Sequence, residues 1–470
     1  MTVELPTTGL DELRFRLRGG LHEEGSAEYE DACTLFNSMI ERRPRLVAWC
    51  AAPDDVTAAL RFARDAGLEI AVRGGGHSVT GRSLCDDGLV LDLRGMRDVD
   101  VDAEERVVRV GGGATWAEVD RATQAHGLAT TGGRVSTTGV AGLTLGGGSG
   151  WLERKHGLAC DNLLAAELVT ADGELVRASA EENADLFWAL RGGGANFGVV
   201  TSMEFRLHPV GPQVLAGLLL HPGDRGADVL RLFRDVMAEA PEELGLAFAY
   251  ITAPDEPDVP RELHGKPAVM VAGMYAGPVE EGEDVLRPLR EFGPAAADYF
   301  EPTGYADFQC SIDDPPGFRN YWTAENLAAL PDEAIDVIAE CGAKLPAGPS
   351  QLFIVPWGGA VAQADAESSP LAGRDAAFVV HPLLLWEDAA DDERMVALGR
   401  AYRDDLAPFA TGAAYLNFLG DEGDARVRAG FGERNYARLA EVKTVWDPAN
   451  TFRGNQKLLP PAEPAAREER

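Results

Sequence analysis

The first 210 residues carry short hydrophobic patterns of the kind found in alternating α and β units. Between residues 53 and 67 apolar side chains recur at helical spacing and Gly67 ends the pattern, so a helix is expected there. Its buried face is predicted to hold Val56, Ala59, Leu60 and Ala63. Strands are predicted at 68–72, 89–93, 106–110 and 199–207, the last from strict apolar–polar alternation.

Longer patterns replace these short units from about residue 212 onward. They predict a helix at 228–240 and strands at 268–275, 351–357 and 376–386. Nearer the C-terminus, a strand is expected at 413–419 and a helix at 435–446, and the residues from 459 to 470 read as a disordered tail. The chain therefore divides into a first domain and a second α+β domain.

The amino-acid composition is that of an ordinary globular protein, except for an excess of glycine. Of 470 residues, 45% are hydrophobic and 25% are charged, but 53 are glycine. Because glycine costs backbone entropy, glycines gathered in clusters indicate that the backbone must approach something closely.

The charge balance restricts the possible partners. A formal net charge of −33 repels phosphate backbones and anionic lipid, so neither nucleic acid nor a membrane is an expected partner. An anionic ligand would have to be held locally, by backbone N–H groups. The expected partner is a small-molecule substrate; the sequence does not indicate an oligomeric state.

The six cysteines are scattered and form no CxxC pair, which disfavours a zinc or iron–sulfur site and a disulfide scaffold. No metal site is expected. The N-terminal residues lack an apolar signal core and no run approaches membrane-spanning length, so the cytoplasm is the expected compartment.

Four glycine-rich segments carry the candidate chemistry. They are RGGGHSVTG (73–81), GGGATW (111–116), TTGVAGLTLGGGSG (137–150) and RGGGANFGVV (191–200). Successive backbone N–H groups without side chains can chelate a pyrophosphate. Neither GxGxxG nor GxxxxGK[ST] is completed, which disfavours the Rossmann fingerprint and the P-loop. The residues alone therefore indicate a phosphate-bearing cofactor without identifying it.

His77 lies in the first of these segments. A histidine after glycines is most often a loop residue or a capping donor. Within a loop that closely approaches a cofactor, its imidazole nitrogen could instead attack an electrophilic carbon of that cofactor.

Five segments, taken in order, carry a family resemblance. They are RGGGHS (73–78), TTGVAGLTLGGGSGW (137–151), KHGLACDNLL (155–164), DLFWALRGGGANFGVV (185–200) and NYARLAEVKTVWDPANTFRGNQ (435–456). Together they resemble the berberine bridge enzyme-like flavoproteins of the vanillyl-alcohol oxidase fold superfamily, most closely the bacterial branch that includes 6-hydroxy-D-nicotine oxidase. The matching parts span about residues 40–208 and 411–458.

The resemblance implies an α+β protein with a vanillyl-alcohol oxidase-type FAD-binding domain and an antiparallel-sheet substrate domain backed by helices. The implied division is 1–211 and 411–458 for the FAD-binding domain, 212–410 for the substrate domain and 459–470 for the tail. His77 stands where the family's histidine bonds to the 8α-methyl carbon of the flavin. The residues implied at the cofactor are Arg73, Gly74, Gly75, Gly76, His77, Ser78, Gly81, Thr137, Thr138, Gly139, Gly142, Gly146, Gly147, Gly148, Gly198, Val200 and Asn455.

Two departures from the family pattern matter. Many relatives attach the flavin a second time through a cysteine, but Val135 occupies that place here and Cys160, further along, reads as a small buried side chain. Attachment through His77 alone is therefore expected. Many relatives also use a tyrosine base where this chain has Phe418, which cannot accept a proton.

The sequence consequently leaves two candidates for the catalytic base. Alternation along the predicted strand places Tyr415 and Asn417 on one face and Phe418 on the other, so Tyr415 is one candidate. His381, in the strand 376–386, is the second. Both residue types are as often structural, Tyr415 with a satisfied hydroxyl and His381 as a buried histidine. An apolar substrate pocket could be lined by Phe300, Tyr305, Tyr321, Trp322 and Trp357, although such aromatics are more often core.

The resemblance implies an FAD-dependent oxidoreductase. It would oxidise an alcohol, an amine or a sugar-like C–H by hydride transfer to flavin N5, with oxygen or another molecule as the electron acceptor. Two alternatives remain. One is an NADPH-dependent reductase of the same fold, which would need no attachment histidine. The other is a flavin-binding protein with lost or altered catalysis.

Overall fold

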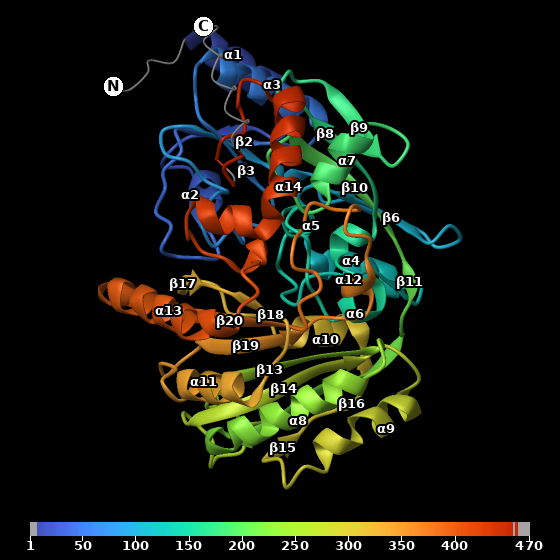
Figure 1. Cartoon of the computed structure of the whole chain (residues 1–470). Helices are drawn as coiled ribbons and strands as arrows, with labels where there is room; N and C mark the ends of the chain where they lie inside the picture. The colour runs from blue at the N-terminus through green and yellow to red at the C-terminus, as the bar shows by residue number, and fades with distance from the viewer. Residues whose placement is uncertain (1–6, 455, 459–470) are drawn as a thin grey trace, which may run out of the picture.

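The computed structural model describes residues 7–454 and 456–458. Asn455 and the predicted tail therefore lie outside the described residues. Figure 1 shows two stacked lobes: the N-terminal and C-terminal parts of the chain share the upper lobe, and the middle part forms the lower one. None of the helices within the described residues is long and apolar enough to cross a membrane.

The upper lobe contains two main sheets. A four-stranded sheet has the order β1-β2-β4-β3 and a five-stranded antiparallel sheet has the order β5-β6-β10-β8-β9. Their bounds are β1 Leu21–His22, β2 Leu46–Trp49, β3 Ile70–Arg73, β4 Leu89–Asp92, β5 Val99–Asp102, β6 Val107–Gly111, β8 Leu163–Val169, β9 Leu175–Ser179 and β10 Val199–Arg206. A third, two-stranded sheet pairs β7 (Leu128–Ala129) with β11 (His208–Pro209).

Helix α3 (Pro53–Asp65) shows how the predicted pattern folds. Its four predicted apolar residues are fully buried and pack with the strands of the four-stranded sheet in one core cluster. Burying one apolar stripe of an amphipathic helix is what fixes such a helix on a sheet. Further helices of this lobe are α1 Thr7–Arg16, α2 Ala27–Cys33, α4 Trp116–Gln124, α5 Val140–Leu145, α6 Glu153–His156 and α7 Ala184–Leu190.

The lower lobe is built on a nine-stranded antiparallel sheet of order β15-β12-β14-β13-β19-β20-β17, with β16 beside β12 and β18 beside β20. Its bounds are β12 Gln213–Pro222, β13 Leu244–Thr252, β14 Pro267–Tyr275, β15 Ala297–Asp298, β16 Glu301–Gly304, β17 Arg319–Trp322, β18 Glu325–Leu327, β19 Gln351–Pro356 and β20 Phe378–Trp386. The strands predicted at 268–275, 351–357 and 376–386 are confirmed as β14, β19 and β20.

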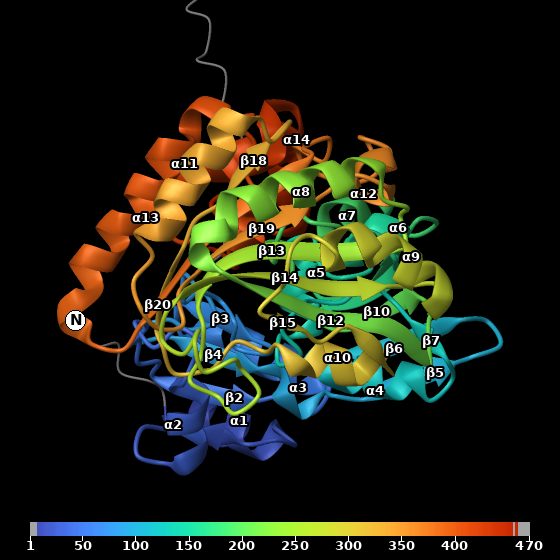
Figure 2. The ribbon, with the colours of Figure 1, turned by 90° about the horizontal axis from the view of Figure 1, so that it is seen from below.

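Helices cover one face of this sheet. Seen from below in Figure 2, α8 (Gly226–Glu239), α9 (Val279–Arg290), α11 (Asp332–Ala343) and α13 (Asp392–Leu406) lie in front of the strands. Along β19, Leu352 and Ile354 belong to the core shared with these helices. Because side chains alternate across a strand, Gln351 and Phe353 face the upper lobe instead. The face of the sheet that is directed toward the upper lobe is not covered by these helices, so its side chains can line a site.

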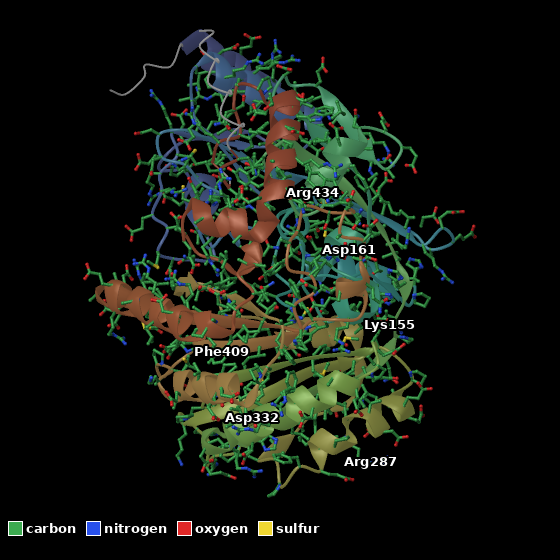
Figure 3. The ribbon with its side chains drawn as sticks, in the orientation of Figure 1. Lys155, Asp161, Arg287, Asp332, Phe409 and Arg434 are labelled. Atoms are coloured by element: carbon green, nitrogen blue, oxygen red, sulfur yellow. The ribbon has the colours of Figure 1, made fainter. Side chains whose placement is uncertain are left out.

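Polar contacts join the two lobes. The ammonium Nζ of Lys155 in α6 donates to the carbonyl of Ala276 beyond β14, at 2.7 Å. Arg374, which precedes β20, donates Nη1 to Oδ1 of Asp161 at 3.0 Å. Figure 3 labels Lys155 and Asp161 at the level where the lobes meet. The short helices α10 (Tyr305–Ser311) and α12 (Ala360–Gln363) also lie at this level.

The C-terminal segment departs from its predicted form. Residues 413–419 do not form a strand; Leu416–Phe418 is a 3₁₀-helix in which Phe418 N donates to Tyr415 O at 3.0 Å. Residues three apart lie on the same side of such a helix. The rings of Tyr415 and Phe418 accordingly touch edge to face, 4.8 Å between centroids, so placing them on opposite faces was wrong. Helix α14 (Asp424–Trp446) begins earlier than predicted, with a break at Gly432, and packs on α7.

Candidate functional site

A cavity of about 1790 Å³ lies between the lobes. Pockets for one small ligand usually measure about 300–1,000 Å³, so this one has room for a large cofactor together with a substrate. The upper lobe contributes mainly glycine loops to its lining, and the lower lobe contributes the open face of the nine-stranded sheet. We refer to these as the upper and lower walls.

The loop that follows β3 presents backbone amides to the cavity. Gly74, Gly75, Gly76, His77 and Ser78 all line it, and their N–H groups have no hydrogen-bond partner within the described part of the chain. Buried or half-buried N–H groups are normally paired, so a run of five free donors indicates a site for anionic oxygens. The upper wall therefore fits the phosphates of a cofactor.

The second glycine loop meets the first one backbone to backbone. A Cβ added to Gly75 would lie 2.3 Å from the amide nitrogen of Gly139, and one added to Gly139 would lie 2.4 Å from that of Gly75. Beyond this contact, no atom lies within 4 Å of a Cβ built on Gly142, which lines the cavity. The two loops thus form one surface, with free space directly in front of it.

Most residues expected at the cofactor do line the cavity: Gly74, Gly75, Gly76, His77, Ser78, Thr138, Gly139, Gly142, Gly146, Gly198 and Val200. Gly81, Thr137, Gly147 and Gly148 are not among the lining residues, and Thr137 is exposed. Val135 lines the cavity, whereas Cys160 is fully buried away from it, and no cysteine is found among the described lining residues.

The side chain of Arg73 points away from the cavity. Its guanidinium donates to the carbonyls of Asp31, Ala32 and Thr34, at 2.8–3.1 Å, and lies 3.9 Å from the carboxylate of Asp92. Arg73 was expected among the residues at the cofactor, and its guanidinium is bonded to these carbonyls rather than lining the cavity. Arg73 instead fastens the segment after α2 beneath the glycine loop.

His77 is held on three sides. Its Nε2 lies 3.0 Å from Oγ1 of Thr137, its Nδ1 lies 3.4 Å from Oγ1 of Thr138, and its ring stacks on Phe36 at 4.4 Å between centroids. Burial, and secondarily the charge of Arg73, lowers the pKa of His77 to about 4. The imidazole is therefore neutral at pH 7 and keeps the lone pair that a nucleophile needs.

Tyr415 does not line the cavity. Its hydroxyl oxygen accepts hydrogen bonds from the amides of Gly148 at 2.8 Å and Ser149 at 2.9 Å, and from Nδ2 of Asn417 at 3.2 Å. The side chain is 2% exposed, and burial raises the pKa of Tyr415. The oxygen that would have to take up a substrate proton is thus already fully engaged, and Tyr415 serves to hold the glycine loop.

His381 does line the lower wall. Its Nδ1 lies 2.8 Å from the carbonyl oxygen of Thr323, so Nδ1 carries the proton and donates. Its Nε2 has no partner among the described residues. The ring is parallel to that of Phe418, 4.3 Å away, and burial lowers the pKa of His381 to about 4. A neutral imidazole, whose buried Nε2 has no partner among the described residues, therefore lies at the lower wall.

Several lining residues carry no signal in the sequence. Gln351 and Phe353 alternate on a strand that was predicted, but nothing local shows which of its faces meets the cavity. Asp313 and Asp314 follow α10, and their site is completed by residues far away in the chain. Of the five aromatics considered for a pocket, Trp322 lines the cavity, and Phe300, Tyr305, Tyr321 and Trp357 are buried in the cores.

Comparison with known proteins matches both ends of the chain to family models. Residues 44–179 match a model described as "FAD binding domain", and residues 414–458 match one described as "Berberine and berberine like". These two segments contribute much of the upper wall.

Full-length relatives also match. An FAD-linked oxidoreductase, pgmH, from Aspergillus terreus is 32% identical over 93% of each chain. The (R)-6-hydroxynicotine oxidase of Paenarthrobacter nicotinovorans is 31% identical over 92% of this chain and 94% of its own. The crystal structure of 6-hydroxy-D-nicotine oxidase from Arthrobacter nicotinovorans superimposes with a TM-score of 0.85 at 29% identity, covering 94% of this chain and 98% of that one.

Proposed function

The chain belongs to the berberine bridge enzyme-like family of FAD-linked oxidoreductases, and from this premise we propose that it oxidises a small molecule with FAD bound covalently through His77. The observation that carries the proposal is the setting of His77. A neutral imidazole, held by two threonine hydroxyls and an aromatic ring, lines a cavity beside five backbone amides that have no partner among the described residues. Val135 leaves His77 as the only proposed point of attachment.

The upper wall would hold the cofactor. The amides from Gly74 to Ser78 suit its pyrophosphate, and the space in front of Gly142 accommodates its bulk. Bound FAD supplies a two-electron acceptor for hydride from a substrate carbon, and oxygen or another molecule then takes up the electrons. In domain terms, we propose that residues 1–211 and 411–458 bind FAD and that 212–410 bind the substrate.

The lower wall would handle the proton. A carbon bearing a hydroxyl or an amine gives up a proton from that group as the C–H bond is oxidised. Nε2 of His381 would accept it, because Nδ1 is committed to the carbonyl of Thr323 and Nε2 has no partner among the described residues. Phe418, stacked against the imidazole, fixes the plane of the ring. His381 is thus our proposed catalytic base, in preference to Tyr415.

Acid precipitation of the purified protein tests the covalent bond. We expect flavin colour and fluorescence in the pellet of the wild-type protein and in the supernatant for His77→Ala, because the variant has no nucleophile to bind the cofactor. His126→Ala, which removes an exposed histidine outside the cavity, is the matched control and keeps flavin in the pellet. Flavin that stayed with the pellet of His77→Ala would contradict the proposed tether.

A further inference from the structure

The two walls of the cavity differ in charge. The lower wall, made by residues between 216 and 383, contains seven carboxylates and, among its described residues, neither lysine nor arginine. The upper wall has carboxylates too, but it also presents Arg82, Arg134, Arg426, Arg453 and Lys457. Arg134 is already neutralised, since its Nη2 lies 2.6 Å from Oε1 of Glu153. The substrate side of the cavity is therefore strongly negative.

Two carboxylates of this wall, Asp313 and Asp314, are fixed by hydrogen bonds, and Asp313 is bonded to the residue just before the second glycine loop. Asp313 accepts from the amide of Ser136 at 2.5 Å and from its hydroxyl at 2.6 Å. Asp314 accepts from Nε2 of Gln351 at 3.1 Å. Among the described residues, the hydrogen-bond partners of the two carboxylates are Ser136 and Gln351, and neither of these carries a charge. Burial and the neighbouring charge of Asp313 raise the pKa of Asp314 to about 6. This pair lacks a cation.

His381 independently indicates a ligand at the same place. It is 1% exposed, lines the cavity and has an unpartnered Nε2. In the sheet, Gln351 pairs with Leu383 and Phe353 pairs with His381, so Gln351 and His381 are diagonal neighbours, about 7–8 Å apart. Asp314, which is bonded to Gln351, and His381 therefore belong to the same part of the lower wall.

Aromatic rings complete the surroundings. Trp322, Phe353 and Phe418 line the cavity around His381, and the ring of Trp322 meets the imidazole edge to face at 5.3 Å. The faces of such rings attract an organic cation as well as packing on its apolar part. Carboxylates together with aromatic rings therefore favour a positively charged organic ligand over an anionic one.

We propose that the substrate of this enzyme carries a basic nitrogen and is bound as a cation, with the carboxylate of Asp314 as its counter-ion and Asp313 beside it. The inference rests on the proposed function, because it assigns the substrate class to the same cavity. It selects amines from the broader set of alcohols, amines and sugars. Asp314 acts here as a specificity-determining residue.

Isothermal titration calorimetry on the purified holoprotein tests this directly. The probe is benzyltrimethylammonium, a fixed cation with an aromatic ring, and benzyl alcohol is the neutral comparison. We expect the cation to bind at least about tenfold more tightly than the alcohol, and Asp314→Asn to weaken it by about tenfold or more. Asp314→Glu, which keeps the charge, should stay within about threefold of wild type.

Asp307→Asn is the matched control, because it removes one negative charge from an exposed lining residue of the same wall. It should change cation binding by less than about twofold. Equal binding of cation and alcohol, or equal losses in Asp314→Asn and Asp307→Asn, would overturn the inference. Calorimetry does not depend on flavin colour, so failure here is distinct from a colourless acid pellet, which instead overturns the proposed function.

Discussion

The two walls of the cavity present different kinds of groups to it. The upper wall uses backbone: its loops are glycine-rich, and Gly75 and Gly139 approach so closely that neither tolerates a side chain. The lower wall uses side chains that project from alternate positions of a sheet, such as Gln351, Phe353 and His381. Backbone recognition suits a cofactor that does not change, whereas side-chain recognition is easily altered from one substrate to another.

The largest effect is expected from Gly75→Ala, which attacks the backbone contact of the upper wall. The added Cβ would lie 2.3 Å from the amide nitrogen of Gly139, so the two glycine loops must separate. We expect the purified variant to lose essentially all bound flavin, measured as the ratio of flavin absorbance to protein absorbance.

Gly142→Ala provides a control for folding rather than for flavin content, because it adds the same methyl group to the same wall where no protein atom lies within 4 Å. Within α5, alanine is favoured over glycine by about 1 kcal/mol, so the flavin-free variant should melt no lower than wild type. Full flavin content in Gly75→Ala would show that the loops need not touch.

A smaller effect is expected on the lower wall from His381→Leu. Removing the acceptor nitrogen should slow anaerobic flavin reduction by the best available substrate about 10²–10⁴-fold, the usual contribution of a positioned base. Covalent flavin content should not change, because His381 lies on the opposite wall from His77. Leu383→Met, a volume-conserving change in the same wall, should retain the rate within about threefold. An unchanged rate in His381→Leu would remove it as the base.

The smallest effect is expected from a change in Asp120, which joins helix α4 to helix α10. Asp120 in α4 is 1% exposed and accepts from Nε2 of Gln309 in α10 at 3.0 Å, and burial raises the pKa of Asp120 to about 7. The unfolded chain ionises this group near pH 4, whereas the folded chain keeps it protonated until about pH 7. Stability is therefore lost as the pH rises through that window and then stays level.

Asp120→Asn removes this titration, and its stability advantage over wild type should grow from about pH 4 to pH 7. Because the pKa of Asp120 is shifted by about 3 units, the gain in the free energy of unfolding has an upper bound of about 4 kcal/mol. Chemical denaturation at pH 5 and pH 8 measures it. An advantage that is the same at both pH values would mean that Asp120 is already ionised in the folded protein.

The sequence revealed the upper wall more fully than the lower one, for a physical reason. A loop that binds through its own amides needs glycines next to one another, and that pattern is local, so RGGGHS and TTGVAG could be recognised. Even there, the sequence pattern did not show which side chains point into the cavity. The guanidinium of Arg73 is buried away from the cavity, and the hydroxyl of the exposed Thr137 contacts His77 without lining the cavity itself.

The lower wall depends on tertiary structure and was largely hidden. Asp313 is fixed by Ser136, which is 177 positions away in the chain, and no local pattern records that contact. The predicted strand at 413–419 failed similarly. Alternating apolar residues are compatible with a strand, but the hydroxyl of Tyr415 binds two loop amides, and the segment turns as a 3₁₀-helix to allow it.

The alternation along β19 and β20 also bears on how such an enzyme diversifies. Leu352 and Ile354 anchor the covering helices, while their immediate neighbours Gln351 and Phe353 touch the reaction space. Each strand thus encodes two separate tasks at interleaved positions. Mutagenesis restricted to the inward positions can explore new substrates while the buried scaffold and the glycine loops of the upper wall remain unaltered.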